Sequence, residues 1–313
     1  LRMTSLDKES SKISSKSGID GFSKSITPMA SEIMPIDLCG VEFCPNEGYS
    51  NVMACCGYSL EEGENSRKGS VIFRVIENKG LKKCDALELK EGILDAKWHR
   101  STKFQMPILA CASSEGIVLL KINENGEKMM PRILHRTASN FSLSIDWFEE
   151  KVLVGERSGE ISVWNCEMET EENRFKAHFY GGSDLSAEVW TAFFNRFDSN
   201  LVVSGADDCL MKLWDLRDKP EKPCHVMKDH EMGVTSGEWD SSNVNQFATG
   251  SYDEKVRLWD IRRLENGPIC SCKVGGGVWR VRWEPKLKAI NGDQDACLLL
   301  ACMHGGAKVV RLR

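Results

Sequence analysis

The sequence predicts an all-β fold in which repeated four-stranded sheets form a β-propeller. Short β-rich runs recur along most of the chain, and an aromatic residue ends the first run of each unit. In addition, the string ATGSYDEKVRLWD at residues 248–260 repeats VSGADDCLMKLWD at residues 203–215. A repeat of about 45 residues is typical of propellers, in which each unit is one four-stranded blade.

The elements follow one another in a regular order. Residues 1–35 are rich in Ser and Lys and lack periodicity, so we expect a mobile tail before a propeller domain over residues 36–313. After its first run, each unit offers two more β-rich runs, such as residues 51–58 and 70–76, bounded by Gly, Asp or Asn turn signals, and a fourth run that leads into the next unit. Six first strands are visible, with aromatic anchors at Phe43, Trp98, Trp147, Phe194, Trp239 and Trp283.

The endings of two units identify the type of repeat. The units that end in Trp214-Asp215 and Trp259-Asp260 resemble WD40 repeats, and SVWNC around Trp164 is the nearest of four degenerate endings. Propellers of this family usually close with seven blades. We therefore expect a seven-bladed plan in which the last blade is incomplete or is completed by N-terminal residues.

The repeats also place polar residues at fixed spacings. In WD40 repeats such residues form a hydrogen-bonded tetrad: the carboxylate accepts from the imidazole, the imidazole donates to the hydroxyl, and the hydroxyl reaches the indole N–H. We interpret these residues as structural and not as a hydrolase triad. The two tetrads are His178, Ser204, Asp208 and Trp214, then His230, Thr249, Asp253 and Trp259.

Composition excludes several classes of function. The formal net charge of −5 disfavours nucleic acid as a ligand. The 13 cysteines, an odd number without CxxC spacing, predict a reducing compartment, small buried thiols and no metal site. The longest apolar stretch, residues 296–303, is too short to cross a membrane. We expect a cytoplasmic, monomeric protein without a cofactor, and no familiar catalytic motif such as GxSxG or HExxH occurs.

Function should reside in residues that the repeat does not explain, at the face where loops converge on the central channel. His304, in a turn beside Gly305, is a candidate general base, although an exposed turn histidine is an equal alternative. Trp190 and Trp279 occupy equivalent positions before the first strands, and with Tyr252 they suit a quaternary ammonium group through cation–π attraction, or else simply pack between blades.

A more specific resemblance covers residue 40 to the end. The strings AHFYGGSDLSAEVWTAFFN, DHEMGVTS, GGVWRVRWEP and LLLACMHGGAKVV, with the two long repeats, resemble the diphthine methyl ester hydrolases of diphthamide synthesis, also called diphthine methyltransferases. The resemblance implies hydrolysis of the methyl ester on a modified histidine of elongation factor 2, which releases methanol and diphthine. Elongation factor 2 would be the protein substrate, and other enzymes of the pathway are possible partners.

The substrate side chain implied by this resemblance carries a trimethylammonium group next to the ester. Glu188 and Asp207 would then add negative potential around the indoles. Arg280, beside Trp279, is a candidate to hold a carboxylate bidentately, with an ordinary surface cation as the alternative. The backbone N–H groups of Gly275–Gly277 are candidate oxyanion donors.

The rival interpretation is a non-catalytic WD40 adaptor, for example a substrate receptor of a cullin–RING ubiquitin ligase, or a reader of methyl or phosphate marks. It depends on Arg217 and Arg262 in the two WDxR boxes, which otherwise pair with a neighbouring carboxylate.

Overall fold

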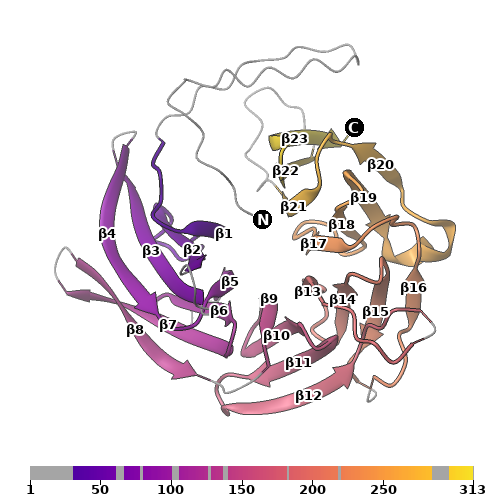
Figure 1. The fold of residues 1–313 in the computed structure, drawn as a ribbon, viewed down its shortest axis with the longest axis horizontal. Coiled ribbons are helices and arrows are strands. Elements are labelled where there is room, and N and C mark those ends of the chain that lie inside the picture. Colours follow the sequence, from indigo (N-terminus) through magenta and orange to yellow (C-terminus); the bar gives the residue numbers. More distant parts are fainter. Residues whose placement is uncertain are drawn as a thin grey trace.

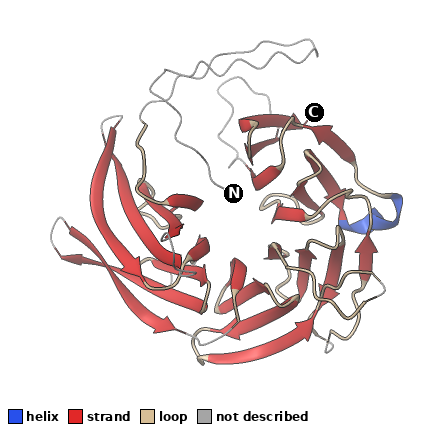
Figure 2. Ribbon diagram, viewed as in Figure 1, coloured by secondary structure: helices blue, strands red, loops and turns tan. Residues whose placement is uncertain are grey.

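Six β-sheets stand side by side around a common centre in the computed structural model of the protein (Figure 1). The structure describes residues 31–60, 67–77, 80–100, 106–125, 128–136, 140–181, 183–217, 220–283 and 296–312. Five of these sheets have four strands and the sixth has three, with consecutive strands paired antiparallel from the centre outward. Figure 2 shows strands throughout the ring and one short helix near its outside. The predicted all-β propeller is confirmed.

The bounds of the elements follow the repeat. The first sheet contains β1 (Asp37–Phe43), β2 (Val52–Leu60), β3 (Arg67–Glu77) and β4 (Gly80–Leu89), and the second β5 (Ile93–Trp98), β6 (Ile108–Ser113), β7 (Gly116–Asn125) and β8 (Lys128–Arg136). The third contains β9 (Ser142–Phe148), β10 (Lys151–Glu156), β11 (Glu160–Asn165) and β12 (Thr170–Lys176), and the fourth β13 (Thr191–Phe194), β14 (Leu201–Gly205), β15 (Met211–Asp215) and β16 (His225–Met227). The fifth contains β17 (Val234–Trp239), β18 (Gln246–Ser251), β19 (Lys255–Asp260) and β20 (Cys270–Lys273), with the 3₁₀ helix η1 (Ile261–Asn266) between the last two, and the sixth β21 (Val278–Trp283), β22 (Ala296–Cys302) and β23 (Gly306–Leu312).

The core lies between the faces of neighbouring sheets. The second strand of a sheet is covered on both faces, so it reads as a continuous apolar run and not as an alternating one. In β10 and β18 every residue after the first is buried. Six of the 13 cysteines are buried, at positions 44, 55, 56, 111, 297 and 302, while Cys224, Cys270 and Cys272 are exposed. The prediction of buried thiols is therefore wrong for about half of them, because the outer strands are open to solvent.

Three of the aromatic anchors, Trp98, Trp147 and Trp283, join their inner strand to the one before it. The indole Nε1–H of Trp98 donates to the Glu42 carbonyl at 3.0 Å, and the same group of Trp147 donates to the Lys97 carbonyl at 2.9 Å. Strand β13 has a phenylalanine at this position, and Arg196 supplies the donor instead, with Nη1 2.9 Å from the Trp147 carbonyl. These side chains therefore use carbonyls of the preceding inner strand as acceptors across the boundary between two sheets.

One anchor differs from expectation. The side chain of Phe43, at the end of β1, is 50% exposed, whereas Trp98 and Trp147 are buried. Phe43 belongs to the first sheet, which faces the opening between the first and sixth sheets in Figure 1. Val309 on β23 is similarly exposed. The seventh blade stays a prediction, since its proposed N-terminal part falls on residues 1–30, outside the described residues, as does nearly all of the predicted tail.

Carboxylates on the inner strands make a second set of links. Asp95 on β5 accepts a hydrogen bond from the backbone N–H of Ile145 on β9, and Asp146 accepts from that of Phe194 on β13. Glu238 on β17 accepts from the N–H of Trp283 on β21 in the same way. Three of the inner strands, β5, β9 and β17, therefore hold the next one through a buried or half-buried acidic side chain.

Arginines of the sixth sheet reach the first two sheets. Arg282 on β21 forms an ion pair with Glu42 on β1, and Arg280 donates from Nη2 to the Leu94 carbonyl at 3.1 Å. Burial by itself would raise the pKa of Glu42, but Arg282 and Lys97 lower it from 4.5 to about 2. The charged form of Glu42 is thus part of what connects the two ends of the described ring.

We expect the change Glu42→Gln to loosen the sixth sheet, because Arg282 loses its ionised partner. Backbone amides of β21–β23 should exchange hydrogen faster than in the wild type. The depressed pKa means that this contribution is fully present above about pH 4.5 and is lost as the pH falls towards 2. Hydrogen exchange measured at pH 7 and at pH 3 checks both parts. Equal exchange of β21–β23 in variant and wild type at pH 7 would contradict the prediction.

Candidate active site at the channel mouth

The first tetrad is a closed chain of buried hydrogen bonds. His178 Nδ1 lies 2.8 Å from the Asp208 carboxylate, and its Nε2 lies 2.7 Å from Ser204 Oγ, which also accepts from Trp214 Nε1 at 2.9 Å. Burial lowers the pKa of His178, which therefore stays neutral at pH 7. A neutral ring that donates to the carboxylate accepts from the hydroxyl, so the direction predicted for the Ser204 bond is corrected.

The second tetrad contains a fifth member. Arg257 Nη1 lies 2.7 Å from both His230 Nδ1 and the Asp253 carboxylate, which are themselves 3.5 Å apart. Because the guanidinium can only donate, His230 accepts at Nδ1 and donates from Nε2 to Thr249 Oγ1 at 3.1 Å. The two tetrads thus hold opposite histidine tautomers, and neither histidine is available for catalysis.

The two WDxR arginines pair within their own boxes. Arg217 donates from Nη2 to Asp215 at 2.6 Å, and Arg262 donates from Nη2 to Asp260 at 2.6 Å. In each box the backbone N–H of the arginine bonds to the same carboxylate. Both arginines therefore pair with a neighbouring carboxylate, which the sequence left open as the alternative to binding of a ligase adaptor.

A cavity of about 280 Å³ lies at the mouth of the channel. Its walls come from the first four sheets and the sixth, so they are far apart in sequence. The cavity is aromatic and basic, with one acidic side chain. The lining residues are Tyr58, Arg67, Phe141, Arg157, Glu188, Trp190, Trp279 and Arg280, with Cys39, Leu94 and Leu143.

Two indoles form one wall of this cavity. Trp190 precedes β13 and Trp279 lies in β21, and their ring centroids are 5.9 Å apart at an interplanar angle of 59°. Trp190 Nε1 donates to Asp207 Oδ1 at 2.9 Å, which fixes the ring from the β14–β15 turn. Tyr252 belongs to the same surface, since a Cβ added to Gly233 would lie 2.6 Å from the Asp207 carboxylate and 3.3 Å from the Tyr252 ring.

The charges around the indoles are mixed. Arg157 Nε donates to Glu188 at 2.9 Å, and Arg280 lies 3.5 Å from Asp95 with its Cζ 5.1 Å from the centre of the Trp279 ring. Burial raises the pKa of the Asp207 carboxyl, against the hydrogen bond from Trp190. Burial also raises the pKa of Tyr252, and the negative charges of Asp207 and Glu188 add to it.

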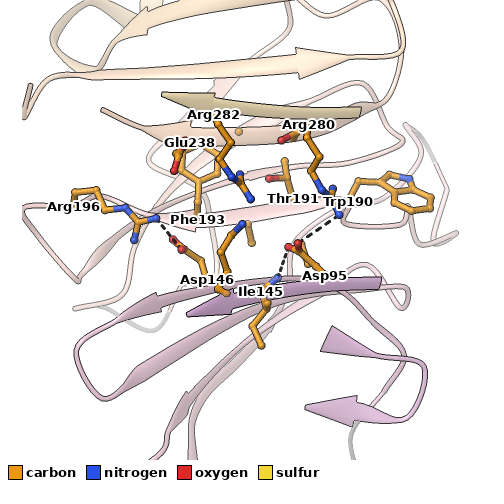
Figure 3. A pocket seen from close by; sticks show the side chains of 15 residues that line it. Asp95, Ile145, Asp146, Trp190, Thr191, Phe193, Arg196, Glu238, Arg280 and Arg282 are labelled. Carbon is orange, nitrogen blue, oxygen red and sulfur yellow. Dashed lines mark hydrogen bonds and ion pairs between the residues drawn. The ribbon is translucent and has the colours of Figure 1, made fainter. Parts of the chain in front are cut away.

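A smaller cavity of about 20 Å³ lies in the channel next to this site (Figure 3). Trp190 and Arg280 line both cavities. Ser144 Oγ, Arg196 Nε and Arg280 Nε are buried without hydrogen-bond partners in the part of the chain that the structure describes. The volume is enough for about one water molecule.

His304 lies away from the cavity. It is exposed in the turn between β22 and β23, and it is not among the residues that line either cavity within the described ranges. Gly275–Gly277 pack against the same turn, since a Cβ added to Gly276 would lie 2.8 Å from the Gly305 nitrogen, and they do not line the cavity either. His304 and Gly275–Gly277 are therefore not part of the cavity lining, and their roles as base and oxyanion donors stay predictions.

Sequence reasoning missed the walls from the first three sheets. Tyr58, Arg67, Phe141 and Arg157 belong to degenerate repeats, in which no equivalent position in another unit singles them out. Among the described residues, no group of three His, Cys, Asp or Glu is placed to hold a metal ion. Nor does any helix in those residues have the length and apolarity to span a membrane.

Comparison with known proteins gives three findings. The family model "WD domain, G-beta repeat" matches residues 173–215 and 221–260. The chain is 31% identical over 311 residues to a diphthine methyltransferase homolog of Dictyostelium discoideum, which covers 86% of this chain and 79% of that protein. It is 30% identical over 302 residues to the diphthine methyltransferase of Mus musculus, covering 86% of this chain and 60% of the mouse protein, so it spans less than two thirds of that relative.

A further relative and a solved structure are also similar to this chain. The diphthine methyltransferase of Schizosaccharomyces pombe is 27% identical over 287 residues, with 89% of this chain and 80% of that protein covered. A chain in the crystal structure of a mitotic checkpoint complex superposes with a TM-score of 0.56 at 15% identity, covering 94% of this chain and 88% of the other, which shows the fold alone.

The ring of sheets, the two intact Trp-Asp repeats and the cavity at the channel mouth define a WD40-repeat propeller with a ligand-sized site. The match to the Dictyostelium protein covers most of both proteins, so a particular family within this class can be assigned. The chain belongs to the diphthine methyltransferase family.

Proposed function

We propose that this protein is a carboxylic ester hydrolase of diphthamide synthesis. It removes the methyl ester from the modified histidine of elongation factor 2 and releases diphthine and methanol. The observation that carries the proposal is the pair of indoles 5.9 Å apart in the 280 Å³ cavity of a member of this family. The protein substrate would approach the channel mouth in the cytoplasm.

The indole pair supports recognition of the trimethylammonium group. Trp190 and Trp279 present aromatic faces to the cavity, and Glu188 and Asp207 add negative charge beside them. A desolvated cation over an indole gains about 2 kcal/mol. Such a wall positions the cationic end of the substrate and leaves the ester to face the charged side of the cavity.

The charged side supports ester hydrolysis. Glu188 lines the cavity as its acidic group and is suited to accept a proton from water. The water oxygen bonds to the ester carbonyl carbon, and Arg280 is suited to stabilise the oxyanion that forms. The bond to the methoxy oxygen then breaks, and the proton held by Glu188 leaves with methanol. Glu188 and Arg280 therefore take the roles expected for His304 and the glycine loop.

Methanol release from methylated diphthine on elongation factor 2 tests the proposal directly. The wild-type protein should release one methanol per modified histidine. Absence of turnover, combined with stable capture of another protein that is lost in Arg262→Ala, would favour the adaptor function instead.

The change Trp279→Leu should raise KM by about tenfold with a smaller effect on kcat, because a cation–π contact of about 1–2 kcal/mol is lost from substrate and transition state alike. Trp279→Phe keeps an aromatic face and should retain part of the affinity. An unchanged KM in Trp279→Leu would separate this indole from substrate binding. Circular dichroism of both variants controls for folding.

A further inference from the structure

Arg67 is held in the cavity by two aromatic rings. Its Cζ lies 5.3 Å from the centre of the Tyr58 ring and 5.2 Å from that of Phe141. Tyr58 comes from β2 and Phe141 precedes β9, so the guanidinium is stacked between side chains of the first and third sheets. Such stacking fixes the plane of the guanidinium and leaves its edge free for bidentate hydrogen bonds.

The backbone near Arg67 is shaped around its side chain. Gly92 lies so close that an added Cβ would meet Arg67 Cβ at 2.7 Å and Arg67 Cδ at 3.1 Å. Arg67 is the first residue of β3, paired with Leu60 at the end of β2. The absence of a side chain at Gly92 therefore lets the stem of Arg67 lie against the chain.

The cavity holds more positive than negative charge. Arg157 has Glu188 as its partner, and Arg280 has Asp95. Arg67 has no ion pair and no hydrogen bond among the described residues, and its Nε is buried without a partner. Arg157 also lies over the Phe141 ring, with Cζ 5.5 Å from its centre, so two cations share one ring. A partly buried guanidinium without a counter-ion favours an anionic ligand.

We propose that Arg67 binds the carboxylate of a ligand whose trimethylammonium group lies against Trp190 and Trp279. The ligand class is a betaine, in which a quaternary ammonium and a carboxylate are close together. This inference rests on the proposed function, because the carboxylate is the group that hydrolysis of the methyl ester produces. Arg67 therefore retains the reaction product in preference to the ester, and the product competes with the substrate.

Glycine betaine and choline form a matched pair of probes, because both carry a trimethylammonium group and they differ in the carboxylate. Trp190 and Trp279 line the cavity, so tryptophan fluorescence reports binding without any turnover. At constant ionic strength, glycine betaine should bind the wild-type protein at least tenfold more tightly than choline. Arg67→Gln should remove most of that difference and leave choline binding unchanged.

Two controls complete the experiment. Arg67→Lys keeps the charge without the planar guanidinium and should give an intermediate affinity for glycine betaine. Arg217→Gln changes an exposed arginine paired with Asp215 and should bind both probes like the wild type. Loss of the response in Trp190→Phe/Trp279→Phe assigns the signal to the cavity.

The outcomes separate this inference from the proposed function. Equal affinities of Arg67→Gln and wild type for glycine betaine would overturn the role of Arg67, even if methanol release is intact. Tight, Arg67-dependent betaine binding by a protein that releases no methanol would keep the carboxylate site and refute the esterase. With both activities present, the free product should inhibit Arg67→Gln about tenfold less than the wild type.

Discussion

The change Glu188→Gln is expected to slow methanol release by about 100-fold or more at neutral pH, because a general base contributes about 10²- to 10⁴-fold to such a reaction. Glutamine keeps the size of the side chain and still accepts a hydrogen bond from Arg157, but it cannot take a proton from water. Proton transfer to the base occurs only in the transition state, so kcat should fall by this factor, whereas the loss of negative charge beside the indoles should raise KM by much less.

His304→Ala is the control for this prediction. His304 is exposed and lies outside the cavity lining, so its removal should leave kcat and KM as they are. Asp207→Asn separates the two carboxylates near Trp190, since it should alter the position of the indole and thus KM more than kcat. Full turnover in Glu188→Gln, together with loss of turnover in His304→Ala, would return the role of base to the histidine.

The repeat in the sequence accounts for most of the fold and for four of the eleven residues that line the cavity. Four of the six predicted substrate-binding residues, at positions 188, 190, 279 and 280, line the cavity, and Asp207 bonds to one of them. These residues lie in or next to the clearest repeats, where an equivalent position in another unit shows which side chains turn towards the mouth. Arg67 and Phe141 come from units without that regularity.

The position of His304 within the repeat does not predict whether its side chain lines the cavity. The turn between β22 and β23 lies against the segment before β21, since the Met303 N–H donates to the Gly277 carbonyl at 2.9 Å. Trp190, just before β13, and Trp279, the second residue of β21, line the cavity, whereas His304 is exposed and does not. An equivalent place in the repeat predicts the face of the propeller, but it does not predict which side chains line the cavity.

The second tetrad differs from the first because of a single change at an equivalent position. Lys212 in β15 and Arg257 in β19 both precede the Leu-Trp-Asp ending. Lys212 Nζ donates to the Ala177 carbonyl at 2.6 Å and stays 3.8 Å from Asp208. The Arg257 guanidinium instead bonds to both the histidine and the carboxylate, because its planar group presents several donors. The two cations occupy equivalent positions in the sequence, but they bond to different partners in the structure.

Because the Arg257 guanidinium bonds to both His230 and Asp253, the loss of Asp253 should destabilise the propeller most. The side chains of Arg257 and Asp253 are 4% and 1% exposed. Asp253→Ala leaves the guanidinium buried without its carboxylate, so the free energy of unfolding should fall by about 3–5 kcal/mol. Asp208→Ala, in the first tetrad, removes the acceptor of a neutral histidine and of the Leu210 N–H, while Lys212 keeps its bond to the Ala177 carbonyl, so it should lower this free energy by about 1–3 kcal/mol. Urea unfolding of both variants measures the difference.

Removal of both charges tests whether the unpaired arginine is the cause. Asp253→Ala/Arg257→Met should recover much of the lost stability, because an apolar replacement of a buried ion pair costs little. If the double variant is as unstable as Asp253→Ala, the defect instead lies in the turn that Asp253 closes through the Lys255 N–H at 2.9 Å.

Acid provides an independent measure of the same ion pair. Burial by itself would raise the pKa of Asp253, but the Arg257 guanidinium and two backbone N–H groups hold it well below its ordinary value of 3.8. A carboxyl with a depressed pKa in the folded state stabilises above its unfolded pKa, and the contribution is lost as the pH falls below about 4. The wild-type protein should therefore lose stability more steeply below pH 4 than Asp253→Ala/Arg257→Met. Parallel acid profiles would mean that Asp253 carries no such charge in the folded protein.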